Sequence, residues 1–104
     1  MRTGGYGDER YQVGTIMPIV GRIDASTVGQ LRDQLHSAVD GGIGVVVLDL
    51  SDVEMVDAVG LAMLVAGHSR ALRAGRRIVL RGTPPRIARL LHATGLDRVL
   101  TAVA

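Results

Sequence analysis

The feature that most constrains the fold is a continuous aliphatic run in the middle of the chain. Residues 44–50 read Gly-Val-Val-Val-Leu-Asp-Leu, and no polar residue interrupts the run before Asp49. A strand that is apolar at successive positions, instead of alternating, is typical of a central strand covered on both faces. The sequence therefore predicts a sheet built around this strand. Residues 51–56, which are more polar, are interpreted as a loop.

Helical patterns flank this strand on both sides. The first helix opens near Asp24 or Ser26, either of which can accept hydrogen bonds from the first backbone N–H groups, and ends at residues 41–42, Gly-Gly. The second covers residues 58–74, with Asp57 as its N-cap and Gly75 just past its end. The third has Thr83 as its cap, with Pro84 in the first turn, and ends at Gly95. Apolar residues recur at helical spacing in the first helix: Val28, Leu31, Leu35, Ala38 and Val39.

The remaining apolar segments predict short strands. Residues 11–14 and 16–21 are interpreted as two strands joined by a turn near Gly14, residues 76–81 as another, and residues 99–103 as a short last one. The order is β-β-α-β-α-β-α-(β). Strands that alternate with helices indicate an α/β fold, in which helices cover a sheet.

Length and composition limit the functions that the chain can have. The 104 residues fit one domain, with a Gly-rich polar segment at 1–10 interpreted as a mobile tail before a single domain at 11–104. There is no Cys, and the three His residues are scattered without metal-ligand spacing. We therefore expect no disulfide, no metal site and no cofactor. Neither a signal-peptide pattern nor a run of ~18 apolar residues is present, which predicts a cytoplasmic protein without membrane insertion.

The net charge of +2 hides an asymmetry between the two halves of the chain. Residues 1–57 carry four Arg against nine acidic residues, whereas residues 58–104 carry eight Arg against Asp97 alone. The basic half could be a solvated surface, or it could meet nucleic acid, an acidic membrane or an acidic protein. Stacking aromatics and known DNA-binding patterns are missing, so we expect no direct binding to nucleic acid.

The second predicted helix has two apolar faces. At about 100° per residue, one face, assigned to the sheet, gathers Leu61, Leu64, Val65, His68 and Leu72. The opposite side is also apolar, and Arg70 and Arg73 border it. This second face is interpreted as a contact surface, although single exposed apolar residues are common on any protein. Its members are Val59, Met63, Ala66 and Arg70.

Acidic residues raise the question of catalysis. Asp24, Asp49 and Asp57 could gather at one edge of the sheet and hold Mg²⁺ or act as acid and base. However, Asp24 and Asp57 precede helices, where a carboxylate is favoured by the positive helix end. The chain has no phosphate-loop, dinucleotide or Ser-nucleophile motif. We therefore expect that the protein is not an enzyme.

Three segments together resemble the STAS domain, a family named after sulphate transporters and anti-sigma factor antagonists. They are Val20-Gly21-Arg22-Ile23-Asp24, Val46-Val47-Leu48-Asp49-Leu50-Ser51 and Val56-Asp57-Ala58-Val59-Gly60-Leu61. The resemblance covers residues 11–103. It implies a mostly parallel sheet of four to five strands with helices packed on one side.

The resemblance also implies a function. Antagonists of this family bind an anti-sigma factor, in some cases a serine kinase, and so release a sigma factor that activates transcription. They bind through the start of the second helix and the loop before it. The partner-binding residues expected on this basis are Asp24, Asp57, Ala58, Val59, Gly60, Met63, Ala66 and Arg70.

The chain departs from the family pattern at one position. Val59 stands where the antagonists carry the Ser that the kinase phosphorylates, and Val has no hydroxyl. The expected antagonist is therefore constitutive or regulated by another route. An alternative is a STAS subunit that docks on the ATPase of a phospholipid-transporting ABC system. The outer face of the second helix could also pair two copies in a homodimer, and an enzyme or nucleotide-binding protein is the least favoured class.

Overall fold

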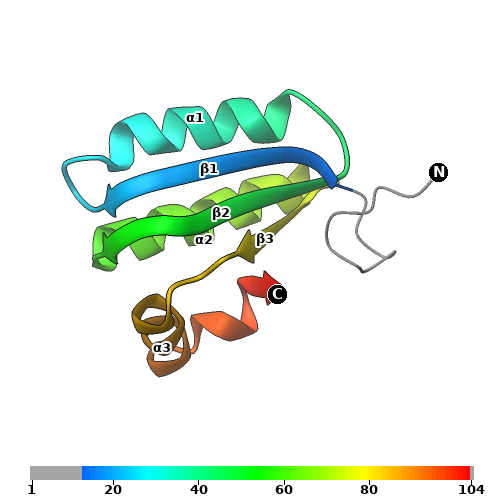
Figure 1. Cartoon of the computed structure of the whole chain (residues 1–104). Helices are drawn as coiled ribbons and strands as arrows, with labels where there is room; N and C mark the ends of the chain where they lie inside the picture. Colours follow the sequence, from blue (N-terminus) through cyan, green and yellow to red (C-terminus); the bar gives the residue numbers. More distant parts are fainter. Residues whose placement is uncertain (1–12, 104) are drawn as a thin grey trace.

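The computed structural model describes residues 13–103, and the side chain of Val13 is not part of the description. The tail predicted at 1–10 and residues 11–12 of the first predicted strand lie outside the described part. Figure 1 shows the elements in order: β1 Val13–Ile23, α1 Val28–Asp40, β2 Val45–Val56, α2 Ala58–Arg73, β3 Arg77–Arg81, α3 Pro85–Ala93, a short 3₁₀ helix at Leu96–Arg98, and β4 Thr101–Val103. No helix among these residues has the length and apolar character needed to cross a bilayer.

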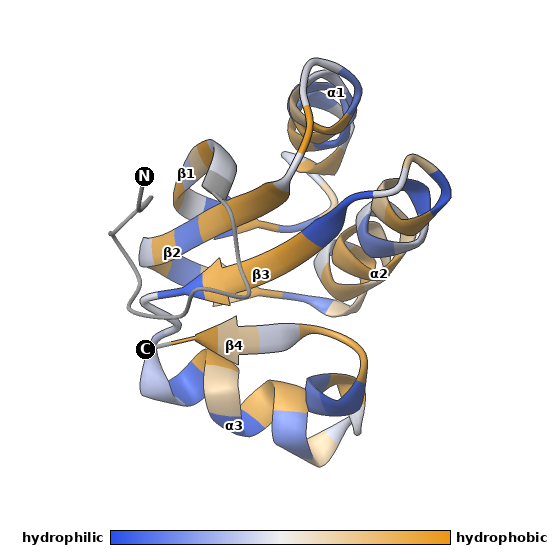
Figure 2. Cartoon of the chain, turned by 90° about the vertical axis from the view of Figure 1, so that its right-hand side faces the viewer, coloured by the Kyte–Doolittle hydropathy of each residue, from blue (hydrophilic) through white to orange (hydrophobic). Residues whose placement is uncertain are grey.

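The four described strands form one parallel sheet in the order β1-β2-β3-β4. In Figure 2, α1 and α2 cover one face of this sheet and α3 lies beside β4. Side chains from all three helices, including Leu35, Leu64 and Leu91, belong to the same buried cluster. The predicted α/β fold with helices on one side of a mostly parallel sheet is confirmed.

One strand stands where two were predicted. β1 runs without a turn through Gly14 and Thr15 and pairs with β2 along its length. The expected turn was wrong because Gly14 serves another purpose: a Cβ at this position would collide with the carbonyl oxygen of Ile43. The pairing of β1 with β2 shifts register near Gly14 and near Pro18, but β1 continues as a single strand.

β2 is longer than predicted, because residues 51–56 continue the strand instead of forming a loop. Ser51, Asp52 and Glu54 in this extension are exposed, whereas Val53 and Val56 are buried. β1 pairs along this extension, as far as the pair Ile23 and Val56. The carboxyl ends of β1 and β2 therefore meet at the same edge of the sheet.

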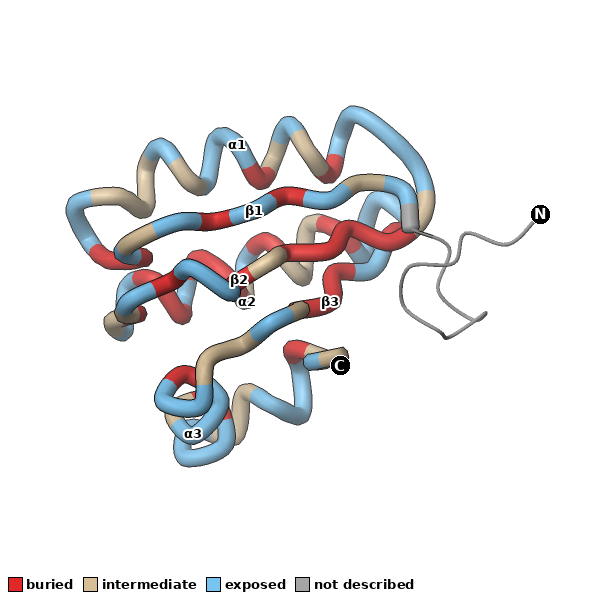
Figure 3. The backbone as a smooth tube through the Cα atoms, viewed as in Figure 1, coloured by how far each residue is buried: buried red, intermediate tan, exposed pale blue. Residues whose placement is uncertain are grey.

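The core is aliphatic and centred on β2 (Figure 3). Val46, Leu48 and Leu50 are fully buried on the helix side. Val45 and Val47 are buried on the opposite side, where they form a second cluster with Val79. The prediction that residues 45–50 form a strand buried on both faces is confirmed.

Arg76 is the largest polar side chain buried among the described residues, and its hydrogen bonds connect α1, the loop before β2, and β1. Its guanidinium group donates to four carbonyl oxygens and to the Thr15 hydroxyl, at 2.6–3.1 Å. Two of these carbonyls belong to the last turn of α1, which ends at Asp40, just before the Gly41-Gly42 pair that was predicted to stop it. The carbonyl groups belong to Ala38, Val39, Ile43 and Gly44.

The other helix boundaries agree with the sequence to within a few residues. α2 has Asp57 as its N-cap and ends just before Gly75, which adopts a φ of 72°. α3 begins at Pro85 with Pro84 as its N-cap, so Thr83 does not cap the helix as predicted. The Thr83 hydroxyl is buried and has no hydrogen-bond partner among the described residues.

Candidate partner-binding site

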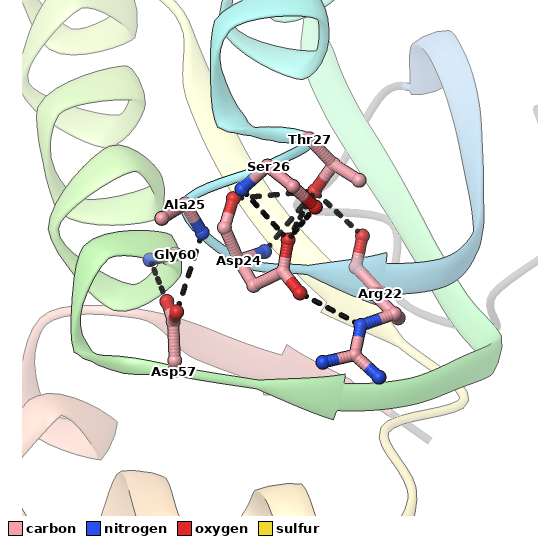
Figure 4. A network of polar contacts seen from close by, with 7 residues as sticks. All are labelled: Arg22, Asp24, Ala25, Ser26, Thr27, Asp57 and Gly60. Atoms are coloured by element: carbon pink, nitrogen blue, oxygen red, sulfur yellow. Dashed lines mark hydrogen bonds and ion pairs between the residues drawn. The ribbon is translucent and has the colours of Figure 1, made fainter.

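Two turns lie side by side where β1 and β2 end. Ile23 and Val56 are paired in the sheet, so residues 24–27, which follow β1, are held next to Asp57, which follows β2. The Asp57 N–H donates to the Ile23 carbonyl at 3.2 Å. Figure 4 shows the turn at residues 24–27 beside Asp57, at the start of α2.

Asp57 joins the two turns through its carboxylate. One oxygen accepts the Gly60 N–H at 2.8 Å, as an N-cap does, and the other accepts the Ala25 N–H at 3.2 Å. The first contact satisfies a free amide at the start of α2, and the second fixes the turn that precedes α1. Asp57 therefore sets the position of the two turns relative to α2.

Asp24 organises the first turn. Its carboxylate accepts hydrogen bonds from the Ser26 hydroxyl at 2.6 Å, the Ser26 N–H at 3.0 Å and the Arg22 Nε at 2.7 Å. These contacts, the Ser26 hydroxyl first and then Arg22, stabilise the charged form and lower the pKa of Asp24 to about 2. Thr27 completes the turn by accepting the Asp24 N–H and donating to the Arg22 carbonyl.

This turn corrects the predicted start of α1. The helix was expected to open at Asp24 or Ser26, but it begins at Val28 with Thr27 at the cap position, and no side chain caps it. Asp24 does accept a backbone N–H, that of Ser26, within the turn. Local side-chain hydrogen bonds of this kind favour a turn over an extra helical turn.

Gly60 lets α2 approach the end of β1. A Cβ on residue 60 would collide with the carbonyl group of Ile23, and Gly60 itself is buried. The first turn of the helix therefore packs directly on the strand backbone. This close approach holds Ala58 and Val59 at the same edge as the turn at residues 24–27.

The exposed side of α2 is rich in small and apolar residues. Val59 is 46% exposed and Leu72 is 56% exposed, and Ala58, Ala62 and Ala66 are also exposed. At 100° per residue these five residues lie on one side of the helix. We call them the outer face of α2; no other described helix or strand covers it.

The predicted contact face was rotated relative to this outer face. Met63 is buried, and Arg70 is only partly exposed. α1 covers that side of α2: Leu35 packs where Gly67 has no side chain, and Arg70 forms an ion pair with Asp40 at 2.7 Å. The amphipathic pattern allowed for packing on the sheet and not for the neighbouring helix.

Leu72 was predicted to face the sheet and instead belongs to the outer face. Ala71 is fully buried in its place near the end of α2. Val59 and Ala66 are exposed as predicted, and His68 is half-buried with an Nδ1 atom that has no partner among the described residues.

Asp49 does not join Asp24 and Asp57. Because β2 continues to Val56, Asp49 lies within the strand, where it bonds the Ser51 hydroxyl at 2.6 Å and Arg81 at 2.6 Å. These contacts, with Ser51 first, lower its pKa to about 2. Within residues 13–103, no three His, Asp or Glu side chains are placed to hold a metal ion.

Sequence reasoning missed Ala62 in the outer face and the contacts that Arg22 and Thr27 make with the first turn. The stretch Asp24-Ala25-Ser26-Thr27 carries a signal for the turn, because Asp, Ser and Thr side chains bond nearby backbone groups. Nothing in the sequence marks Arg22 as the partner of Asp24.

A family model described as "Mlab, STAS domain" matches residues 9–102, which is most of the chain. Solved structures share the fold. A Thermotoga maritima protein assigned provisionally as an anti-sigma factor antagonist is 19% identical with a TM-score of 0.71; the match covers 84% of this chain and 77% of that one.

Two further structures are similar. A sulfate transporter family protein from Wolinella succinogenes is 23% identical with a TM-score of 0.69, over 85% of this chain and 70% of that one. The Bacillus cell fate determinant SpoIIAA, in its phosphorylated form, is 16% identical with a TM-score of 0.65, over 86% and 83%. At these identities the likeness concerns the fold.

Proposed function

We propose that this chain, which belongs to the STAS domain family, acts as an anti-sigma factor antagonist. In this role it binds an anti-sigma factor through the turn at residues 24–27, Asp57 and the outer face of α2. The bound anti-sigma factor then releases its sigma factor, which activates transcription. The protein works by docking and not by catalysis.

The observation that carries this proposal is the outer face of α2. Its small and apolar side chains stand exposed on a helix whose start is fixed by the Asp57 bridge between Ala25 and Gly60. A rigid surface of this kind loses little conformational freedom when a partner helix packs on it. Ala58, Ala62 and Ala66, four residues apart, allow close approach along the helix.

The expected partner-binding residues have different roles in this docking. Ala58, Val59 and Ala66 contact the partner, and Asp24, Asp57 and Gly60 position the turns beside them. Met63 supports α2 from inside the core. Arg70 forms an ion pair with Asp40 at the side of α2 that faces α1.

Val59 is equally consistent with a second function. A docking protein that is not switched at this position fits a STAS subunit bound to the ATPase of a phospholipid-transporting ABC system as well as a constitutive antagonist. The two functions use the same surface and differ in the partner. A homodimer formed through the outer face is a third arrangement, in which the tagged chain would recover only other copies of itself.

The test is capture of the partner from native lysate by the tagged full chain, followed by mass spectrometry. We expect an anti-sigma factor, and we expect its recovery to fall at least about tenfold with Ala66→Asp, which places a charge in the interface. Ile43→Asp is the matched control, because Ile43 is 86% exposed in the loop before β2 and is not part of the outer face of α2. Recovery of a transporter ATPase or of the chain alone would contradict the antagonist function.

A further inference from the structure

Exposed hydroxyl groups are few among the residues whose side chains the structure describes. Ser26, Ser37, Ser51 and Thr94 are the exposed Ser and Thr residues between 14 and 103. Ser51 lies in β2, Thr94 follows α3, and Ser37 lies near the end of α1, whereas Ser26 lies in the turn beside the start of α2. Ser26 is therefore the exposed hydroxyl that adjoins the surface assigned above to the partner.

The Ser26 hydroxyl holds a defined place in that turn. It donates to one oxygen of the Asp24 carboxylate at 2.6 Å, and the Ser26 N–H donates to the same oxygen at 3.0 Å. Ala25, between these two residues, donates its N–H to Asp57 (Figure 4). A change at Ser26 therefore reaches the Asp57 bridge through adjacent residues.

We propose that Ser26 is a phosphorylation site and that its phosphate releases the bound partner. This inference rests on the proposed function and supplies the regulation that Val59 cannot. A serine kinase would transfer the γ-phosphoryl group of ATP to the Ser26 Oγ. The new Oγ–P bond replaces the bond from the γ-phosphorus to the bridging oxygen, ADP leaves, and the hydroxyl proton passes to the base of the kinase.

The modification conflicts with the contacts of the turn. An esterified Oγ no longer donates, and the phosphate adds about −1.5 to −2 charges next to the ionised Asp24 carboxylate. Arg22, whose side chain is 59% exposed, is the cation paired with that carboxylate. A phosphate on Ser26 would compete with Asp24 for this cation, which would leave Asp24 without its ion pair and displace Ala25 from Asp57.

The site is tested first on the protein as it occurs in its own cells. Trypsin cleaves after Arg22 and Arg32, so Ser26 and Thr27 fall in the same ten-residue peptide. Fragment ions must therefore distinguish the two. We expect phosphate on Ser26 in at least one growth phase. Phosphate on Thr27 instead, or a peptide unmodified in every growth phase, would overturn the proposal.

The effect of the phosphate on the turn and on partner binding is tested with a protein that carries phosphoserine at position 26, incorporated during synthesis. A protein with phosphoserine at position 37 is the comparison. We expect the amide NMR signals of Ala25 and Gly60 to shift only in the first protein. We also expect its affinity for the captured partner to fall about tenfold or more, from repulsion and a disordered turn. Phosphoserine at 37 should bind like the unmodified chain and controls for added charge.

The two proposals fail on different results. Unchanged amide signals, or unchanged affinity with phosphoserine at 26, would overturn the role of Ser26 and leave the antagonist function standing. Partner binding that survives Ala66→Asp would instead remove the outer face of α2 from the interface.

Discussion

The carboxylate of Asp57 accepts the backbone N–H of Ala25 at 3.2 Å, although 32 residues separate the two in sequence. The same carboxylate caps α2 through Gly60. One side chain thus fixes both the helix and the turn that border the outer face of α2.

Replacing Asp57 tests this double role. Asp57→Ala removes both hydrogen bonds, and we expect it to lower the free energy of unfolding by about 1–2 kcal/mol, the usual cost of losing an N-cap. Asp57→Asn retains an acceptor for Gly60 and should lose less. Urea denaturation measures both. A stability equal to that of the unchanged protein in Asp57→Ala would show that the bridge contributes nothing.

Two glycines in helices are expected to respond in opposite ways to alanine. At Gly60 the added Cβ meets the Ile23 carbonyl, which is backbone and cannot easily move, so Gly60→Ala should destabilise by about 1–3 kcal/mol.

Gly29 is the matched control for Gly60. It lies in α1 with nothing within 4 Å of the added Cβ, so Gly29→Ala should stabilise by about 0.5–1 kcal/mol through helix propensity. Thermal and chemical denaturation measure the stability of both variants. Equal effects at the two positions would mean that α2 does not approach β1 as closely as described.

Acid should weaken the turn at residues 24–27 in a defined window. The pKa of Asp24 is about 2 in the folded protein, below its ordinary value of 3.8. A group with a lowered folded pKa stabilises the fold above its unfolded pKa, and this contribution is lost as pH falls. We therefore expect a loss of stability between about pH 4 and pH 2.

The pH dependence is measured by denaturation at a series of pH values. Asp24→Asn should be less stable than the unchanged protein at pH 7 and should depend less steeply on pH in the window. The pKa of Asp49 is similarly lowered, so Asp49 contributes to stability in the same pH range. The stability of the double variant Asp24→Asn with Asp49→Asn should therefore depend still less on pH. Parallel pH curves for the single variant and the unchanged protein would refute the assignment.

Arg76 is expected to resist even conservative replacement. Its planar guanidinium group reaches five acceptors from one buried position, and a Lys ammonium has three donors in a different geometry. Arg76→Lys should cost about 2–4 kcal/mol, because buried acceptors lose charged donors. Arg73→Lys, at an exposed position near the end of α2, is the control and should change stability by less than about 0.5 kcal/mol. Equal losses would show that burial of Arg76 is unimportant.

Local patterns predicted most of the fold. The aliphatic run before Asp49 marked the central strand, and Asp57 and Gly75 marked the ends of α2. The extension of β2 to Val56 was missed because its polar residues resemble a loop; only pairing with β1 makes them a strand. The strand at Gly14 was broken in the prediction because Gly signals a turn more often than a close backbone contact.

The candidate site was predicted only in part, because some of its residues depend on contacts that are distant in sequence. Asp57, Val59 and Ala66 could be placed from sequence because capping and helical periodicity are local. Met63 was misplaced, since the side of α2 that α1 covers depends on the Leu35 contact and the Arg70–Asp40 pair. These contacts join residues about 30 positions apart, so the helical pattern of one segment cannot predict them.

The most direct test of the partner-binding surface is an NMR titration of the isotopically labelled chain with the partner that it captures. We predict that the amide signals of Ala25, Val59, Ala62 and Ala66 shift or broaden first, while those of Ile43 and of α3 do not. Changes confined to α3 and β4, with the outer face of α2 unaffected, would contradict the proposed interface.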